Sequence, residues 1–370
     1  MVHRVKRVLR YNLEFVGHSV SDVVRSRKRV LYFGWLGERN FGDEALFYCI
    51  ERLLTDKVRL YGSNKVSRLL IRNFLEKHYF DFLMLGGGTF INVNKEVVDY
   101  INDKRKYIQD MVVFGTGAVN GEFWGSVKGW SDMSYEWADI LSDCRLIGVR
   151  GPDSLEYLRK LGIDHAKVIG DPVLILGYDM VKKKERKKRV GVNFGFSRDR
   201  LWGKSDLRFA KKILSVCKVL HTHGWDISFF SVWPTDTSFI KECLDSEFAG
   251  SIEFDIFNAW EHDISTAMKY FDGIDVFIAE KLHAGIVAAC TYTPFIMFEY
   301  RTKCRDFMKS VDLLDLNIRT DRVDIDRVVY EVNSLYEDVD RYQRHLYERV
   351  QFYRQQLKDF AGQILTTFDC

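Results

Sequence analysis

The chain has 370 residues and a formal net charge of +3. This length exceeds one ordinary hydrophobic core, so we expect two domains. The apolar fraction of 46% and the charged fraction of 29% are those of a globular protein and exclude a disordered chain. The small net charge gives no reason to expect a nucleic-acid partner.

No stretch approaches the roughly 18–20 uninterrupted apolar residues that a membrane-spanning helix needs. The N-terminus lacks the apolar core and the cleavage site of a signal peptide. The seven cysteines are scattered and form no CxxC pair, which favours free thiols in a reducing compartment over disulfides or a zinc site. We therefore expect a soluble, cytoplasmic α/β protein that holds neither a metal nor a cofactor.

Residues 1–28 form a basic N-terminal arm. They carry seven Lys and Arg residues against only Glu14 and Asp22, and their apolar residues recur at helical spacing. A basic amphipathic helix of this kind can lie on an anionic membrane surface, which would place the protein at the inner face of a membrane. The alternative is an arm packed on the first domain with its basic face in water.

Residues 29–180 predict an N-terminal Rossmann-like domain, in which apolar strands alternate with helices. Strands are expected at 29–34, 57–61, 81–85, 111–114, 145–150 and 167–172, and helices from 45 onward, at 67–78 and at 155–161. Asn40 or Asp43 is the candidate N-cap of the helix that follows the first strand. The glycine spacing of that first loop is not GxGxxG, and no P-loop Lys-Ser/Thr follows, so a standard nucleotide motif is excluded.

Glycines follow two strands of this domain. Backbone amides at such positions can approach a ligand closely, or the glycines can serve a tight connection between strand and helix. Because two such exits occur in one sheet, a ligand crevice is favoured. The residues are Gly86, Gly87, Gly88 and Thr89 after one strand, and Gly115 and Gly117 after the next.

Arg150 stands at the end of a further strand of this domain. At this position an arginine is either an ion-pair strut or a bidentate clamp for an anion. The dense basic run 181–189 is expected to be a solvated linker. A C-terminal Rossmann-like domain follows at 190–320, and the apolar periodicity of 321–370 predicts one long C-terminal helix, or two.

In the second domain, one strand-to-helix turn concentrates reactive side chains. Glu280, Lys281, Leu282 and His283 lie between an apolar run, 274–278, and a run of small apolar residues. Ligands bind at the carboxyl ends of parallel strands, and a helix N-terminus there favours an anion. A histidine beside a phosphate has a raised pKa and can act as an acid, although a lone histidine can equally be structural.

A series of motifs resembles, in order, those of the polysaccharide pyruvyl transferases. Residues 34–44 read G-W-L-G-E-R-N-F-G-D-E, which matches the family pattern G-(Y/W)-x-G-x-x-N-x-G-D-E. The later motifs are at 85–88, 115–117, 149–154, 170–172, 281–284 and 294–303. The resemblance implies two Rossmann-like domains in a GT-B-like arrangement, and transfer of pyruvate from phosphoenolpyruvate to a sugar as a ketal. The basic N-terminal arm favours a lipid-linked glycan as the acceptor.

The resemblance also implies roles for individual residues. Arg150 and His283 match positions that grip or activate the donor, whereas Lys281 stands where the family usually has arginine. We expect Arg150, Lys281 and the glycine-loop amides to hold the donor, with His283 as acid and Asp43 or Glu280 as base. The remaining donor-binding candidates are Leu282, Asn40, Thr89 and Lys303.

Two alternatives stay open from the sequence. A glycosyltransferase on the same two-domain scaffold would use a nucleotide-sugar donor, because a fold does not fix a function. A relative without catalytic activity would bind or scaffold enzymes of a glycan pathway. The presence of His283 and Arg150 speaks against the second alternative.

Overall fold

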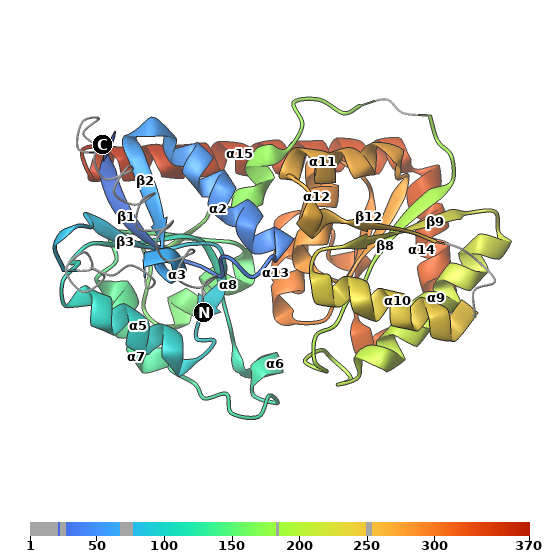
Figure 1. Ribbon diagram of the computed structural model, residues 1–370, viewed down its shortest axis with the longest axis horizontal. Helices are drawn as coiled ribbons and strands as arrows, with labels where there is room; N and C mark the ends of the chain where they lie inside the picture. The colour runs from blue at the N-terminus through green and yellow to red at the C-terminus, as the bar shows by residue number, and fades with distance from the viewer. Residues whose placement is uncertain (1–20, 23–26, 67–76, 183–184, 249–253) are drawn as a thin grey trace, which may run out of the picture. The chain divides into compact units, whose positions relative to one another are not determined.

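A computed structural model describes residues 21–22, 27–66, 77–182, 185–248 and 254–370. The chain forms two compact units (Figure 1). Unit 1 comprises Met1–Glu38, Leu46–Pro172 and Gln356–Cys370, and unit 2 comprises Arg39–Ala45 and Val173–Gln355. The predicted N-terminal helix and most of the predicted helix 67–78 lie outside the described residues.

Among the described residues, unit 1 contains a sheet of seven parallel strands. Six follow the order β2-β1-β3-β5-β6-β7, and β4 pairs with β5. This is a doubly wound order, with its topological switch point between β1 and β3. The strands are β1 (Lys28–Phe33), β2 (Val58–Gly62), β3 (Phe82–Leu85), β4 (Gly88–Ile91), β5 (Met111–Ala118), β6 (Leu146–Val149) and β7 (Lys167–Val168).

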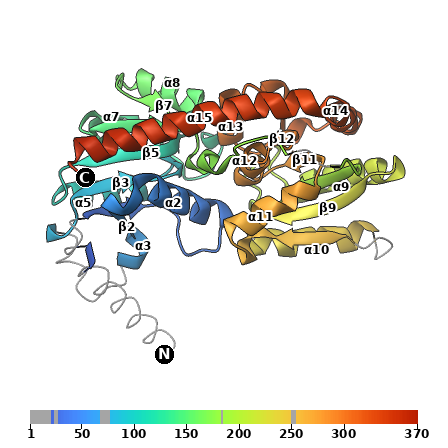
Figure 2. The ribbon, with the colours of Figure 1, turned by 90° about the horizontal axis from the view of Figure 1, so that it is seen from above.

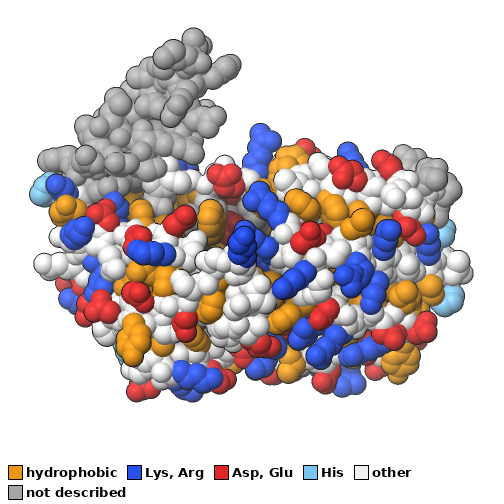
Figure 3. Space-filling view, turned by 90° about the horizontal axis from the view of Figure 1, so that it is seen from below, with side chains coloured by type: hydrophobic (Ala, Val, Ile, Leu, Met, Phe, Trp, Pro, Cys, Tyr) orange, Lys and Arg blue, Asp and Glu red, His pale blue; other side chains and the backbone are white. Residues whose placement is uncertain are grey.

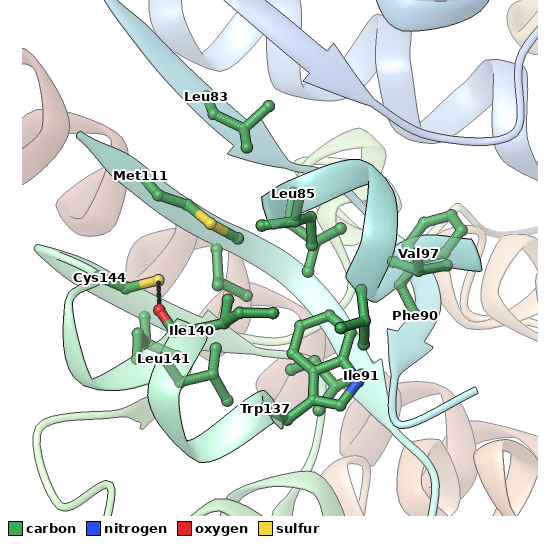
Figure 4. Close-up of a cluster of buried hydrophobic side chains, with 14 of the residues drawn as sticks. Leu83, Leu85, Phe90, Ile91, Val97, Met111, Trp137, Ile140, Leu141 and Cys144 are labelled. Atoms are coloured by element: carbon green, nitrogen blue, oxygen red, sulfur yellow. Dashed lines mark hydrogen bonds between the residues drawn. The ribbon is translucent and has the colours of Figure 1, made fainter. Parts of the chain in front are cut away.

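Helices cover both faces of this sheet. On one face, α5 (Lys95–Arg105) and α7 (Ser134–Ser142) enclose an apolar cluster that includes Leu83, Leu85 and Trp137 (Figure 4). On the other face Phe368, just after α15 (Val339–Thr367), stacks on Phe82 with 4.2 Å between ring centroids. The other helices of this part of the chain are α2 (Phe41–Leu54), α3 (Ser63–Val66), α6 (Gly121–Trp124) and α8 (Pro152–Lys160).

The described part of unit 2 contains a six-stranded parallel sheet in the order β10-β9-β8-β11-β12-β13. Counted within the unit this is the Rossmann order 3-2-1-4-5-6, and the order reverses between β8 and β11. The strands are β8 (Arg189–Asn193), β9 (Asp226–Ser231), β10 (Asp255–Asn258), β11 (Val276–Ala279), β12 (Phe295–Glu299) and β13 (Asn317–Arg319).

Several helices of unit 2 begin at side-chain caps, and one packs closely on the sheet through a glycine. Ser205 and Asp263 cap α9 and α11 by accepting backbone N–H groups of the first turn. Gly285 lets α12 approach β12, because a Cβ there would lie 2.2 Å from the Met297 methyl. The helices are α9 (Asp206–Thr222), α10 (Pro234–Phe248), α11 (Ile264–Tyr270), α12 (Leu282–Cys290), α13 (Thr302–Ser310) and α14 (Ile325–Glu337).

The two parallel α/β units and the long C-terminal helical segment confirm the predicted fold class. The segment consists of α14 and α15 (Val339–Thr367), and α15 contributes residues to both units (Figure 2). The stretch expected as a linker, 181–189, belongs to unit 2, where Lys182 Nζ lies 3.0 Å from Asp272 and the Lys187 N–H donates to Asp275.

The expected end of the fourth predicted strand at residue 114 was wrong. Strand β5 continues through Gly115 and Gly117 to Ala118, with irregular pairing between Phe114 and Thr116. The chain can continue as a strand because Gly115 takes a φ of +69° at the irregular position, a value that residues with a side chain rarely adopt. Strands β4, β10 and β13 and helices α5 and α7 were not predicted.

Charge and hydropathy at the surface agree with the composition. On the face in Figure 3, Lys and Arg side chains are interspersed with Asp and Glu. No helix in the described ranges is both long enough and apolar enough to cross a bilayer. All seven cysteines are free thiols, as predicted.

We predict that Gly86→Ala destabilises the protein by about 1–3 kcal/mol, the usual effect of overpacking. A Cβ at Gly86 would lie 2.0 Å from the ring of Tyr32, which is 1% exposed and has no space to move aside. Gly362→Ala is the matched control, because a Cβ there has no neighbour within 4 Å. It should stabilise α15 by about 0.5–1 kcal/mol. Urea unfolding of both variants measures the difference; equal stabilities would contradict this packing.

Candidate functional site

The turn between β11 and α12 lies at the switch point of the unit 2 sheet, where parallel α/β folds bind ligands. Asn193, the last residue of β8, holds this turn. Its carbonyl accepts the Glu280 N–H (3.0 Å) and its Oδ1 accepts the Lys281 N–H (2.8 Å). Its Nδ2 donates to the Phe230 carbonyl (2.8 Å), so one side chain ties three strand ends together.

Glu280 and Lys281 form a buried charged cluster with Asp236 of α10. The Lys281 ammonium lies 3.5 Å from Glu280 Oε1 and 3.9 Å from Asp236 Oδ1. The Gly195 N–H donates to Glu280 Oε2 (2.7 Å), and the Phe196 N–H donates to Asp236 Oδ1 (2.9 Å). Both carboxyl groups are fully buried and therefore hold their neighbours in fixed positions.

Burial shifts the proton affinities of this cluster. Removal from water raises the pKa of Glu280 to about 7 and that of Asp236 to about 6, despite the nearby Lys281 ammonium, which opposes both shifts. Burial alone would lower the pKa of Lys281, but the two carboxylates outweigh it and raise that pKa. Lys281 is therefore a permanent cation of the site.

Three cations surround the ring of Tyr300, which follows β12. Lys281 Nζ lies 5.1 Å from the ring centroid, and Lys303 Nζ and the Arg301 guanidinium carbon lie 5.0 Å from it. The Arg301 side chain is held in place because its Nε donates to the Arg200 carbonyl (2.9 Å). Positive charge gathered on an aromatic surface at the strand ends suits an anionic ligand.

The imidazole of His283 lies against Gly42. A Cβ at Gly42 would lie 1.9 Å from His283 Nδ1, so only glycine leaves room for this ring. Residues 39–45 belong to unit 2, and the Phe41 N–H donates to the Val232 carbonyl (3.0 Å) at the end of β9. The structure thus brings the motif at 34–44 and the motif at 281–284 into direct contact.

Asn40 and Asp43 occupy the start of α2 beside this contact. Asn40 Oδ1 accepts the N–H groups of Gly42 (3.0 Å) and Asp43 (3.4 Å), so Asn40 is the N-cap of the two residues considered. Asp43 lies in the first turn, next to the glycine that His283 touches. Leu282 is 2% exposed, which makes its side chain part of the core of unit 2.

Arg150 lies within unit 1 and is 1% exposed. Its Nη2 donates to Thr89 Oγ1 (2.8 Å), and its Nη1 lies 3.7 Å from the buried carboxylate of Asp171. A Cβ at Gly117 would lie 2.3 Å from Nη2. This is the geometry of the ion-pair strut, the first of the two alternatives for Arg150, and donor contact by Arg150 stays a prediction.

The glycines of unit 1 each have a reason in packing or backbone conformation. Gly86 accommodates the Tyr32 ring, and Gly87 accommodates Leu46, whose Cδ2 would lie 2.4 Å from an added Cβ. Gly88 has a φ of +105°, and Gly115 lies against Pro172. These contacts fit the alternative of tight connections, and amide contact with a donor stays a prediction.

The predicted site residues therefore form two groups, one in each unit, and contacts within each unit hold the members of its group. Sequence reasoning missed Asn193, Asp236 and Tyr300 in unit 2. Asn193 is a polar residue in the apolar run that opens the second domain, two positions before Gly195, a signal that could have identified it. Nothing in the sequence around Asp236 indicates its contact with Lys281. In the described part of the chain, no three His, Cys, Asp or Glu side chains group as metal ligands do.

Parallel α/β sheets bind ligands at the carboxyl ends of their strands, and the cations at the strand ends of unit 2 suit an anionic ligand. The family model of the polysaccharide pyruvyl transferases matches residues 40–302. The chain belongs to this family, as its motifs predicted, and it is therefore a transferase. A comparison with curated protein sequences gives no significant match.

Solved structures with a related fold have low sequence identity. UDP-GlcNAc 2-epimerase of Methanocaldococcus jannaschii, solved with UDP-GlcNAc and UDP, has a TM-score of 0.51 and 11% identity, covering 84% of this chain and 92% of that one. The Neisseria meningitidis enzyme bound to UDP-GlcNAc has a TM-score of 0.47 and 9% identity, covering 86% and 94%. A Thermobaculum terrenum O-GlcNAc transferase mutant has a TM-score of 0.43 and 13% identity, covering 91% of this chain and 69% of that one. The first likeness concerns the fold alone.

We predict that Arg150→Met destabilises the protein by about 3–5 kcal/mol, because it removes the guanidinium beside a buried carboxylate. The double variant Arg150→Met/Asp171→Asn should recover most of this loss, since the carboxylate charge is removed as well. Thermal and urea unfolding of both variants measure the effect. A stable Arg150→Met variant would contradict the strut and favour the anion clamp.

Proposed function

We propose that this protein moves the pyruvyl group of phosphoenolpyruvate onto a sugar of a polysaccharide or glycan precursor and forms a ketal. Membership of the family supports the pyruvyl transfer. The observation that carries the proposal is the contact between His283 and Gly42, which joins two motifs of the family at one strand edge. The three cations around Tyr300 supply the positive charge that a phosphorylated carboxylate needs.

The donor carries a phosphate and a carboxylate close together, and several cations are needed to hold both. Lys281 keeps the positive charge of the arginine that is usual in the family but lacks its bidentate fork. Arg301 and Lys303 contact the same aromatic ring as Lys281 and compensate for the missing fork. We assign the phosphate and carboxylate of the donor to these three side chains.

In this mechanism His283 protonates the methylene carbon of the donor, or assists the departure of phosphate, as C2 gains oxocarbenium character. One sugar hydroxyl attacks C2, the bond from C2 to the phosphate oxygen breaks, and a neighbouring hydroxyl closes the ketal. The two sugar hydroxyls lose one proton each. One proton accounts for the hydrogen that the methylene carbon gains as it becomes a methyl group, and the other leaves with phosphate. Asp43 is favoured over Glu280 as the base, because Glu280 is buried and engaged with Gly195.

The proposal also includes residues at the strand ends of unit 1. The donor-binding candidates of this unit are the glycine loops and Thr89, with Arg150 acting directly or by holding Thr89 in place. A lipid-linked acceptor, approached through the basic arm 1–28, belongs to the same proposal. Binding to anionic liposomes by chains with and without residues 1–28 tests that part.

A nucleotide-sugar transferase is the competing function, because the fold resembles that of an enzyme solved with UDP-GlcNAc and UDP. A thermal-shift screen with phosphoenolpyruvate and with UDP- and GDP-sugars separates the two. The proposal expects stabilisation by phosphoenolpyruvate, and phosphate release when a panel of glycan acceptors is added. Stabilisation by nucleotide-sugars alone would overturn it, and binding of neither donor would indicate a non-catalytic relative.

We predict that His283→Ala lowers the rate of pyruvyl transfer by about 10²–10⁴-fold, the usual contribution of a positioned general acid. His221→Ala is the matched control, because His221 is an exposed histidine of α9 in the same unit. Release of phosphate from phosphoenolpyruvate in the presence of acceptor measures both variants. Activity of His283→Ala within a few-fold of the unmodified protein would show that His283 is not the acid.

A further inference from the structure

Asp236 occupies a position that none of the motifs includes. It lies in the first turn of α10, 45 positions before Lys281 in sequence, and is fully buried. Its Oδ1 accepts the Phe196 N–H, while its Oδ2 has no hydrogen-bond partner in the described part of the chain. A buried carboxylate oxygen without a donor is costly, so this group is poised to take up a proton.

Asp236, Glu280 and Lys281 are packed as one body around Gly195. A Cβ at Gly195 would lie 2.2 Å from Asp236 Oδ1 and 2.7 Å from Lys281 Cε, and the Gly195 N–H donates to Glu280. The three charged side chains come from α10 and the end of β11. A change in the position of the Lys281 ammonium would therefore change its distance to both carboxyl groups.

The charges of this cluster do not balance when both acids are ionised. Two carboxylates and one ammonium leave a net charge of −1 in a buried place. Other charged or titratable groups lie near the cluster: Asp206 of α9, Tyr300 after β12, and the cations Arg301 and Lys303, which lie around the ring of Tyr300. Asp206 adds negative charge and is held by Ser197 and Asp199, so it does not neutralise the excess.

We infer that Asp236 is a positioning residue of the donor site: with Glu280 it fixes the Lys281 ammonium, and binding of the anionic donor at Lys281 is accompanied by uptake of one proton by this carboxylate pair. The inference rests on the proposed function for the identity of the donor. The proton comes from the solvent and neutralises the excess charge that would otherwise repel the donor.

The direction of the pH dependence follows from linkage. In the free protein the pKa values of the pair, about 6 for Asp236 and about 7 for Glu280, lie near neutrality because both groups are buried. An anion at Lys281 raises these pKa values further, so proton uptake occurs above the pKa values of the free protein. Donor affinity should fall by up to about tenfold per pH unit between roughly pH 7 and 8, and less below pH 6.

Asp236→Asn tests the inference because the amide keeps an acceptor for the Phe196 N–H but cannot take up a proton. Calorimetric titration with phosphoenolpyruvate at pH 7.5, in buffers of different ionisation enthalpy, counts the protons taken up. The unmodified protein should take up close to one proton more than the variant, and protons gained by the donor itself are common to both. At pH 8 the variant should bind the donor several-fold more tightly, with equal affinities near pH 6.

Asp275→Asn is the matched control. Asp275 is also a buried aspartate of unit 2, but it lies just before β11, at the end of that strand opposite Lys281, and accepts the N–H groups of Lys187 and Arg189. Its substitution should leave the proton count unchanged. Glu280→Gln is the second variant of the pair, and it should lose the proton uptake in the same way if Asp236→Asn does not fold.

The outcomes separate the inference from the proposed function. If phosphoenolpyruvate binds and is turned over, but Asp236→Asn and Glu280→Gln take up as many protons as the unmodified protein, the inference is wrong and the function stands. If phosphoenolpyruvate does not bind the unmodified protein at any pH, the proposed function fails first. If Asp275→Asn also takes up fewer protons on binding the donor, the effect is a general one of substitutions in unit 2 and not a role of Asp236.

Discussion

The candidate site depends on the way Asn193 joins the ends of three parallel strands in unit 2. The Asn193 carbonyl and Oδ1 accept the N–H groups of Glu280 and Lys281, and its amide nitrogen donates to β9. At a topological switch point the two loops that follow the central strands diverge, which opens room for a ligand but leaves backbone groups to be satisfied. Asn193 satisfies them and fixes the direction in which α12 begins. Lys281 and His283 take their positions from that direction.

Close packing is the second constraint, and it explains much of what the motifs encode. Gly42 is required by the ring of His283, Gly86 by the ring of Tyr32, and Gly195 by Asp236 and Lys281. In each case a glycine lets a larger functional or core side chain come within contact distance of the backbone. In both units the glycines therefore serve first to allow close packing at the ends of the strands. Any contact they make with a ligand comes in addition to that role.

The sequence predicts the parts of this protein that are local. Continuous apolar runs bounded by polar residues identify most of the buried strands, and the turn at Glu280–His283 is visible because strand, charged residues and helix follow one another. The contacts that complete the site are not local: Asp236 and Tyr300 reach Lys281 from separate elements, and Gly42 reaches His283 from the start of the chain. The short strands β10 and β13 carry too few residues for a periodic signal. Gly115 was misread because a glycine after an apolar run looks like an exit even when the strand continues.

Lys281 shows how these constraints act on one position. An ammonium has three N–H donors that can point in different directions, whereas a guanidinium offers a planar fork. Here two buried carboxylates lie near the ammonium, with Glu280 Oε1 at 3.5 Å and Asp236 Oδ1 at 3.9 Å. The ring of Tyr300 lies beside the same ammonium, with its centroid 5.1 Å from Lys281 Nζ. Where the resemblance to the pyruvyl transferases leads us to expect an arginine, the side chain present is thus a lysine whose ammonium lies beside two buried acids.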